Sequence, residues 1–178
     1  MLKIISMDPS LRNWAVVSAT LIDNVLKIHT TTIIKTANHP IKSTKQSVSD
    51  INAASLLYKS LLPYIKEADV ICIEVPHGSQ SSRAMASYAI CVSLIGALQH
   101  TNPNMVYVSA NDVKKVVRTD KDHKPTKKEV IQWVRDKHPE APLPNTLSAE
   151  HPCDAIVAIY AAMETKQFKE YINANSTK

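Results

Sequence analysis

Short apolar runs separated by tight polar links open the chain and predict three antiparallel strands. The first covers residues 2–7, the second residues 13–22, and the third residues 25–34, which are rich in Thr and Ile. The pair Asp23-Asn24 between the last two runs is a two-residue link suited to a tight hairpin turn. Three consecutive strands with short links form an antiparallel meander at the start of the fold.

The rest of the chain alternates between helical periodicity and short apolar runs. Further strands are expected over residues 69–74 and 104–108, and the first of them is continuously apolar, as in a strand covered on both faces. Helices are expected from Ser49 or Asp50 to Ile65, over 81–99, from Ser109 or Asn111 to about Val117, over 127–137, and from about Pro152 to Met163. These elements predict an α/β fold with a five-stranded mixed sheet flanked by helices, in a single domain over residues 1–178.

The helical spacing also predicts which faces are buried. In the first helix the apolar positions are Ile51, Ala54, Tyr58, Leu61, Leu62 and Ile65, and Pro63 is expected to kink or end the helix. Helix 81–99 places on one side Ala84, Met85, Tyr88, Cys91, Val92, Ile95 and Leu98, and its many small residues make its other face a candidate dimer contact. Helix 127–137 is expected to bury Val130, Ile131, Trp133 and Val134. Polar residues 35–49 predict a mobile loop, and residues 173–178 a frayed tail.

Composition indicates a globular protein. Hydrophobic residues make up 44% and charged residues 21%, and no apolar run reaches the roughly 18 residues of a membrane span. The start of the chain has one lysine, a short apolar run and then an acid, which is unlike a signal peptide. The three cysteines are far apart and form no C-x-x-C, so reduced, buried thiols in a cytoplasmic protein are expected.

The positive charge is concentrated in one segment. The chain has a formal net charge of +5, and residues 114–128 contain seven basic residues against two acids. Such a patch indicates a polyanion, usually nucleic acid, as partner, although a solvated surface loop is the alternative. With only two glycines, at 78 and 96, the chain lacks both a P-loop and a G-x-G-x-x-G motif.

Acids stand at the ends of three predicted elements. Asp8 follows the first strand, Glu74 ends the fourth, and Asp154 lies in the last helix, three residues after His151 and on the same face. The ordinary alternatives are a turn aspartate for Asp8 and a solvated strand-end acid for Glu74. For Asp154 the alternative is a first-turn helix carboxylate, and for His151 a polar helix-start residue. Their joint placement favours a site, and carboxylates with one imidazole suit Mg²⁺ or Mn²⁺.

In this order of elements the chain resembles a RuvC-type Holliday junction resolvase, a family with the ribonuclease H-like fold. The resemblance covers roughly residues 2–163 and is that of a divergent, phage-like member. Asp8 matches the first-strand Asp, Glu74 the fourth-strand Glu, and Asp154 the last-helix Asp, with His151 three residues earlier. Lys114 resembles a lysine near the scissile phosphate, and Lys127 a second basic contact.

Three departures concern DNA contacts. The family usually has a glycine-rich segment between those two lysines and a glycine after the first-motif proline, where this chain has Ser10. It often places an aromatic residue three positions after the fourth-strand Glu, where it can wedge into the junction. This chain has His77 there, and an imidazole stacks on a base more weakly.

The resemblance implies a Mg²⁺-dependent, structure-selective endodeoxyribonuclease, with Mn²⁺ able to substitute, that resolves four-way (Holliday) or branched DNA as a homodimer. Asp8 would bridge two metal ions, with Glu74 and Asp154 each holding one and His151 completing the second. The nicks would leave 5′ phosphates and 3′ hydroxyls, and Lys114 would steady the charge on the phosphate. DNA backbones would be contacted by Lys115, Arg118, Lys121, Lys124, Lys127 and Lys128. The alternatives are another ribonuclease H-like nuclease, acting on RNA–DNA hybrids or as an exonuclease, and a non-catalytic junction-binding protein.

Overall fold

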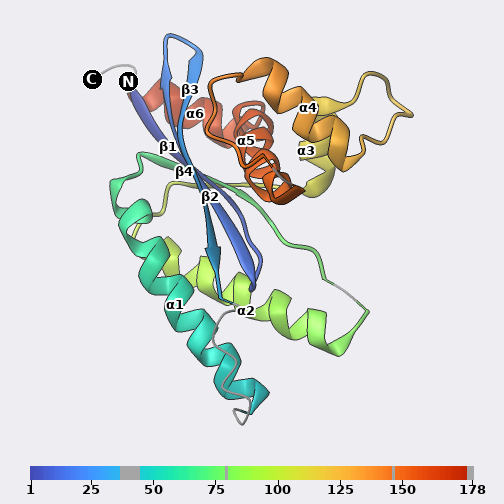
Figure 1. Ribbon diagram of the computed structural model, residues 1–178. Coiled ribbons are helices and arrows are strands. Elements are labelled where there is room, and N and C mark those ends of the chain that lie inside the picture. The colour runs from blue at the N-terminus through green and yellow to red at the C-terminus, as the bar shows by residue number, and fades with distance from the viewer. Residues whose placement is uncertain (37–44, 79, 146, 176–178) are drawn as a thin grey trace.

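The computed structural model describes residues 1–36, 45–78, 80–145 and 147–175, and contains one five-stranded sheet (Figure 1). The strand order is β3-β2-β1-β4-β5. The strands are β1 (Leu2–Asp8), β2 (Asn13–Ile22), β3 (Val25–Lys35), β4 (Val70–Glu74) and β5 (Met105–Val108). β1, β2 and β3 pair antiparallel, whereas β4 is parallel to β1 and β5 is parallel to β4. The predicted mixed sheet, with its first three strands antiparallel, is confirmed.

Helices cover both faces of this sheet. They are α1 (Gln46–Glu67), α2 (Ser82–Gln99), α3 (Ala110–Val117), α4 (Lys127–Lys137), α5 (Glu150–Met163) and α6 (Lys166–Asn175), with a short 3₁₀ turn, η1 (Leu147–Ala149), before α5. Figure 1 shows α1 and α2 on one side of the sheet and α3, α4 and α5 on the other. No helix among the described residues combines the length and apolarity that a membrane crossing would need.

Alternation along the central strands divides the core in two. On β1, Ile4 belongs to the cluster under α5, and Ile5 and Met7 belong to the cluster under α1 and α2. On β4, Cys72 faces the α5 side and Ile73 the opposite side. Since successive side chains of a strand point to opposite faces, Asp8 and Glu74 continue the rows that face α5. The prediction that residues 69–74 are covered on both faces is therefore confirmed.

The β2–β3 link is the tight turn that the sequence predicted. Asp23 and Asn24 both adopt positive φ, 49° and 63°. Asp and Asn tolerate this conformation better than most residues, and a turn with two such residues matches the twist of a hairpin. The turn lies at the opposite end of β2 from Asp8, which pairs with Ala15.

Helix α1 differs from the prediction in its start and in its buried face. It begins at Gln46, and Asp50 is not its cap but binds Arg83 of α2 through both carboxylate oxygens, at 2.5 and 2.6 Å. The buried residues are Ala53, Leu57, Leu61 and Ile65, whereas Ile51 is 66% exposed. The prediction is confirmed for Leu61 and Ile65 and wrong for Ile51, because the sheet selects a stripe that begins two positions later, at Ala53. Of the predicted mobile loop, residues 37–44 lie outside the described part of the chain.

Proline does not end α1. Pro63 lies inside the helix, which continues to Glu67 and keeps Ile65 fully buried. The packing of this last turn against the sheet outweighs the hydrogen bond that proline cannot donate.

Helices α2 and α4 are less buried than predicted. On α2 the buried residues are Cys91, Leu94, Ile95 and Leu98, while Met85 and Val92 are 40% and 39% exposed. On α4 only Val130 and Val134 are buried; Trp133 is partly buried, against Tyr160, with ring centroids 5.2 Å apart. Each helix therefore buries one side and leaves the other exposed to solvent. The three cysteines are free thiols and buried, as predicted.

Helix α6 was missed by the sequence analysis, which expected a tail from residue 173. Its anchor is Phe168, which is 2% exposed in the α5-side core. The Phe168 amide donates to the Thr165 hydroxyl at 3.2 Å, so Thr165 caps the helix. Residues 176–178 of the expected tail lie outside the described part of the chain.

Candidate active site

Two neighbouring parallel strands bring Asp8 and Glu74 together. The register of β1 and β4 pairs Met7 with Ile73, so the two acids follow one position later at the same edge of the sheet. Both side chains continue the rows that face α5. The acids predicted at two strand ends therefore share one edge and one face.

Helix α5 adds His151 and Asp154 to this edge. The ring atom Nδ1 of His151 lies 2.6 Å from Oδ2 of Asp8, which joins the first turn of α5 to the end of β1. The predicted grouping of the imidazole with the first-strand acid is thus present in the structure. Asp154, three residues later on α5, lies within electrostatic range of both strand-end acids, because its charge raises the pKa of Glu74 and the charge of Asp8 raises its own.

Ser6 holds α5 in register with the strands. It is fully buried, and its hydroxyl donates to the Ala155 carbonyl at 2.6 Å and lies 3.3 Å from the Cys72 carbonyl. Since Ala155 follows Asp154 directly, this bond fixes the height of the acid above the sheet. The sequence analysis missed Ser6; a lone hydroxyl on a central strand, two residues before an acid, was the available signal.

The electrostatics of the site disfavour its full ionisation. Burial, followed by the charges of Asp8 and Asp154, raises the pKa of Glu74 to about 8. Burial, followed by Asp8 and Glu150, raises the pKa of Asp154 to about 7. The hydrogen bond to Asp8 raises the pKa of His151 above its ordinary range. The negative charges of the site are therefore unfavourable unless bound protons or a bound cation neutralise part of them.

The donor set fits a divalent cation. Among the described residues, no three His, Cys, Asp or Glu side chains are gathered closely enough to hold a metal ion as they stand. The charge of Asp8 nevertheless raises the pKa of both Glu74 and Asp154, and a cation between these acids would relieve that repulsion. Carboxylate oxygens are the ligands that Mg²⁺ and Mn²⁺ prefer. By charge and by donor type, the residues fit such an ion.

Two of the predicted lysines lie near these acids. The charge of Lys114, on α3, lowers the pKa of Glu74. Lys127, the first residue of α4, forms an ion pair with Glu150 and also interacts with Asp154 and Asp8. Both lysines are exposed. The site is thus a group of acids with cations at its rim, which is where a phosphate group would approach.

Glu150 is a residue of this edge that the sequence analysis missed. It is the first residue of α5 and directly precedes His151. Its charge raises the pKa of both His151 and Asp154. Its place at a helix start next to two candidate ligands was the available signal.

The rest of the basic segment forms an exposed loop and the start of α4. Arg118, Lys121, Lys124 and Lys128 are all exposed. Asp120 has a structural role instead: its carboxylate accepts hydrogen bonds from the amides of Asp122 and His123, at 3.0 and 2.8 Å. The loop is therefore folded around the Asp120 carboxylate and presents its cations to solvent.

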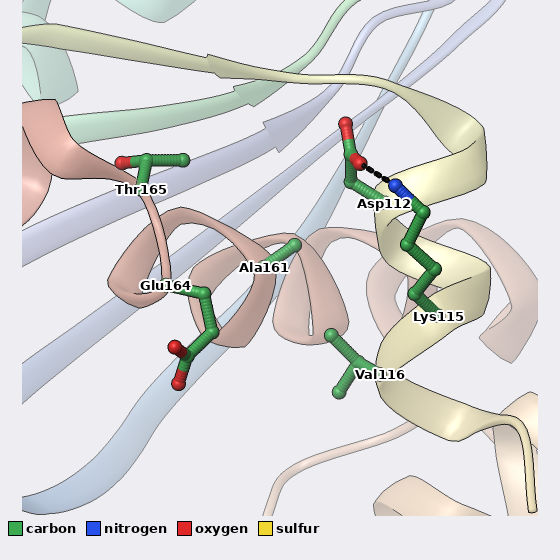
Figure 2. A pocket seen from close by; sticks show the side chains of 6 residues that line it. All are labelled: Asp112, Lys115, Val116, Ala161, Glu164 and Thr165. Carbon is green, nitrogen blue, oxygen red and sulfur yellow. Dashed lines mark hydrogen bonds and ion pairs between the residues drawn. The ribbon is translucent and has the colours of Figure 1, made fainter.

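Lys115 is separate from the acids. It forms an ion pair with Asp112 at 2.8 Å and lines a hollow of about 420 Å³ between α3 and the end of α5 (Figure 2). Ala161, also in the lining, lies about two helical turns beyond Asp154. Glu164, at the rim, pairs with Lys169 at 3.1 Å. This hollow is not the candidate active site, since each of its charged lining residues is already in an ion pair.

His77 lies in the segment that joins β4 to α2, three residues after Glu74, and is exposed. The structure therefore leaves its ring accessible near the edge of the sheet that carries the acids. Gly78, next to it, lies close to Met85: a Cβ there would be 3.3 Å from the Met85 sulfur.

Comparison with known proteins places this geometry in a known fold. No family model matches the sequence, and no curated protein matches it. Among solved structures, Thermus thermophilus RuvC superposes with a TM-score of 0.67 at 14% identity, covering 92% of this chain and 98% of that one. The same protein in complex with a Holliday junction substrate gives 0.66 at 15% identity, covering 92% and 96%. This chain has the RuvC fold. The predicted ribonuclease H-like architecture is thereby confirmed.

A resolvase of Fowlpox virus, in complex with Holliday junction DNA, aligns over 98% of this chain and 99% of its own at 14% identity. Its TM-score is 0.49. At such identities the RuvC likeness establishes the fold, and function has to be argued from the site.

Proposed function

We propose that the protein is a metal-dependent endonuclease that cuts four-way or otherwise branched DNA. The observation that carries the proposal is the convergence of Asp8, Glu74 and Asp154 with His151 at one edge of a RuvC-like sheet. Surplus acids at one place are unfavourable unless a cation offsets them. The exposed basic segment beside them supplies the complementary surface for a nucleic acid backbone.

The chain's own groups have distinct roles in this proposal. Asp8, Glu74 and Asp154, with His151, would hold Mg²⁺ or Mn²⁺, which supplies charge neutralisation at the phosphate and an activated water when bound. His151 orients the Asp8 carboxylate through their 2.6 Å contact. Lys114 balances negative charge that develops on the phosphate. A ring at His77 is available to stack on an unpaired base.

Binding is assigned to the basic segment. Arg118, Lys121, Lys124 and Lys128 would contact phosphates with little dependence on sequence. Lys115 would exchange its exposed ion pair with Asp112 for a phosphate. Affinity should therefore fall steeply with salt.

A homodimer is part of the proposal. The outward side of α2 carries the exposed Met85 and Val92, and a Cβ on Gly96 would meet no atom within 4 Å. Small and apolar residues on one helix face let a second copy approach closely. Two copies related by a two-fold axis would cut two strands symmetrically.

A substrate panel tests the proposal. The purified protein is incubated in Mg²⁺ with a four-way DNA junction, a linear duplex of the same sequence and an RNA–DNA hybrid. Cutting of the junction alone supports the proposal. Digestion of the hybrid without junction cutting would favour a ribonuclease H-type activity, and tight junction binding without cutting in Mg²⁺ or Mn²⁺ would favour a non-catalytic binding protein.

A further inference from the structure

The first residues of α4 and α5 are joined by an ion pair between Lys127 and Glu150. The Lys127 side chain is 76% exposed and that of Glu150 is 26% exposed. The pair stands directly beside His151. A cation at the rim of the site is therefore already engaged by an acid that is not among the candidate metal ligands.

Helix α4 does not depend on this pair for its start. Thr126 caps α4 through a capping box: its hydroxyl accepts from the Glu129 amide, and the Glu129 carboxylate accepts from the Thr126 amide at 2.7 Å. The packing of α4 against α5 is made by the buried Val130 and Val134. An ion pair with so exposed a lysine adds about 0–1 kcal/mol, so it is easily exchanged.

Lys127 also lies in the field of the site. The charges of Asp154 and Asp8 act on it in addition to that of Glu150. An incoming phosphate must therefore compete with Glu150 for this lysine. Once the lysine leaves, the negative charge of Glu150 faces the phosphate.

We propose that Glu150 is a specificity-determining residue that competes with DNA phosphate for Lys127. This inference rests on the proposed function of the same site. In the free protein Glu150 holds Lys127. A backbone phosphate that the rest of the site positions correctly displaces Glu150 from Lys127. A phosphate of loosely bound DNA makes a weaker contact with Lys127 and leaves the ion pair with Glu150 in place. Glu150 thus lowers affinity for DNA in general, and most for DNA that the rest of the site does not position.

The exchange is tested by DNA binding in chelator, where no cutting occurs. Fluorescence anisotropy with a labelled linear duplex and a labelled four-way junction compares wild type, Glu150→Gln, Lys127→Gln and the double variant at several salt concentrations. Glu150→Gln should bind the linear duplex about two- to tenfold more tightly, with a smaller gain on the junction. In the Lys127→Gln background the same substitution should change affinity less than twofold.

The matched control is Glu164→Gln, which removes the same charge from the other end of α5, where Glu164 pairs with Lys169. It should leave affinity within twofold of wild type. Equal gains from Glu150→Gln with and without Lys127 would overturn the inference, since Glu150 would then act only through net charge. A loss or no change of affinity in Glu150→Gln would also overturn it. If wild type binds neither DNA, it is the proposed function that fails.

Discussion

Replacing Glu74 with Gln should stop DNA cutting and at the same time stabilise the metal-free protein. Burial and the charges of Asp8 and Asp154 raise the pKa of Glu74 from its ordinary 4.5 to about 8. Because the folded state binds this proton more tightly than the unfolded chain, the contribution of Glu74 to stability is fully present below pH 4.5 and is lost as pH rises toward 8. A glutamine has the same shape but does not ionise, so the variant does not lose this stability as pH rises.

The size of the effect follows from the shift. One pKa unit corresponds to about 1.4 kcal/mol, so the shift at Glu74 sets an upper bound of about 5 kcal/mol above pH 8. The neighbouring acids share protons and relax, and we expect about 2 kcal/mol from the substitution. For a chain of this size that corresponds to a rise in Tm of about 4–8 °C at pH 8.5. At pH 5, where Glu74 is protonated in the folded state, the difference should nearly vanish.

Thermal unfolding in chelator at pH 5 and pH 8.5 measures this effect. Added Mg²⁺ should then raise the Tm of wild type and raise that of Glu74→Gln less. Glu164→Gln, an exposed acid on the same sheet face but away from the site, should change Tm little at either pH. A Glu74→Gln protein that melts below wild type at pH 8.5, or that gains equally at pH 5, would refute the reasoning.

Three further results are expected. Lys114→Ala should slow junction cutting about 10²-fold with junction affinity within a few fold of wild type in chelator, because its charge acts on the phosphate during reaction; equal losses in binding and cutting would contradict this. Lys121→Gln with Lys124→Gln should reduce the slope of log affinity against log salt by about 1 to 2, as measured by anisotropy, and an unchanged slope would remove these residues from the interface. Ser6→Ala should cost about 1–3 kcal/mol in denaturant unfolding and reduce cutting, since the Ala155 carbonyl loses its buried donor; unchanged stability and activity would show that α5 is held without it.

The sequence was most informative where a local pattern and the tertiary structure agree. The strand ends at Asp8 and Glu74 and the His151-x-x-Asp154 spacing on a helix were predictable, because strand alternation and helical periodicity fix where those side chains point. The hairpin at Asp23 was predictable from turn chemistry alone.

What the sequence could not predict depends on contacts between distant segments. The buried face of α1 is chosen by the sheet, so Ile51 is exposed although it fits the helical period. Asp50 has the residue type of a cap, but the partner it finds is Arg83, 33 positions away. The role of Ser6 appears only when Ala155, 149 residues later, lies beside it.

The pairing of Lys115 with Asp112 shows the same limit for charge. Both residues lie on α3 at i, i+3 spacing, and in the free protein Lys115 is paired with Asp112 at 2.8 Å. A run of basic residues therefore identifies a segment, whereas the folded chain determines which of its members remain available.

We propose that the acids at the edge of β1 and β4 form the active site of a junction-cutting nuclease. The most direct test is cutting of a four-way DNA junction in Mg²⁺, labelled on each strand in turn, by wild type, Asp8→Asn and the matched control Asp23→Asn at the far end of β2. Wild type and Asp23→Asn should make paired nicks at symmetric positions on two opposite strands, and Asp8→Asn should make none. Junction cutting that survives in Asp8→Asn would contradict the proposal.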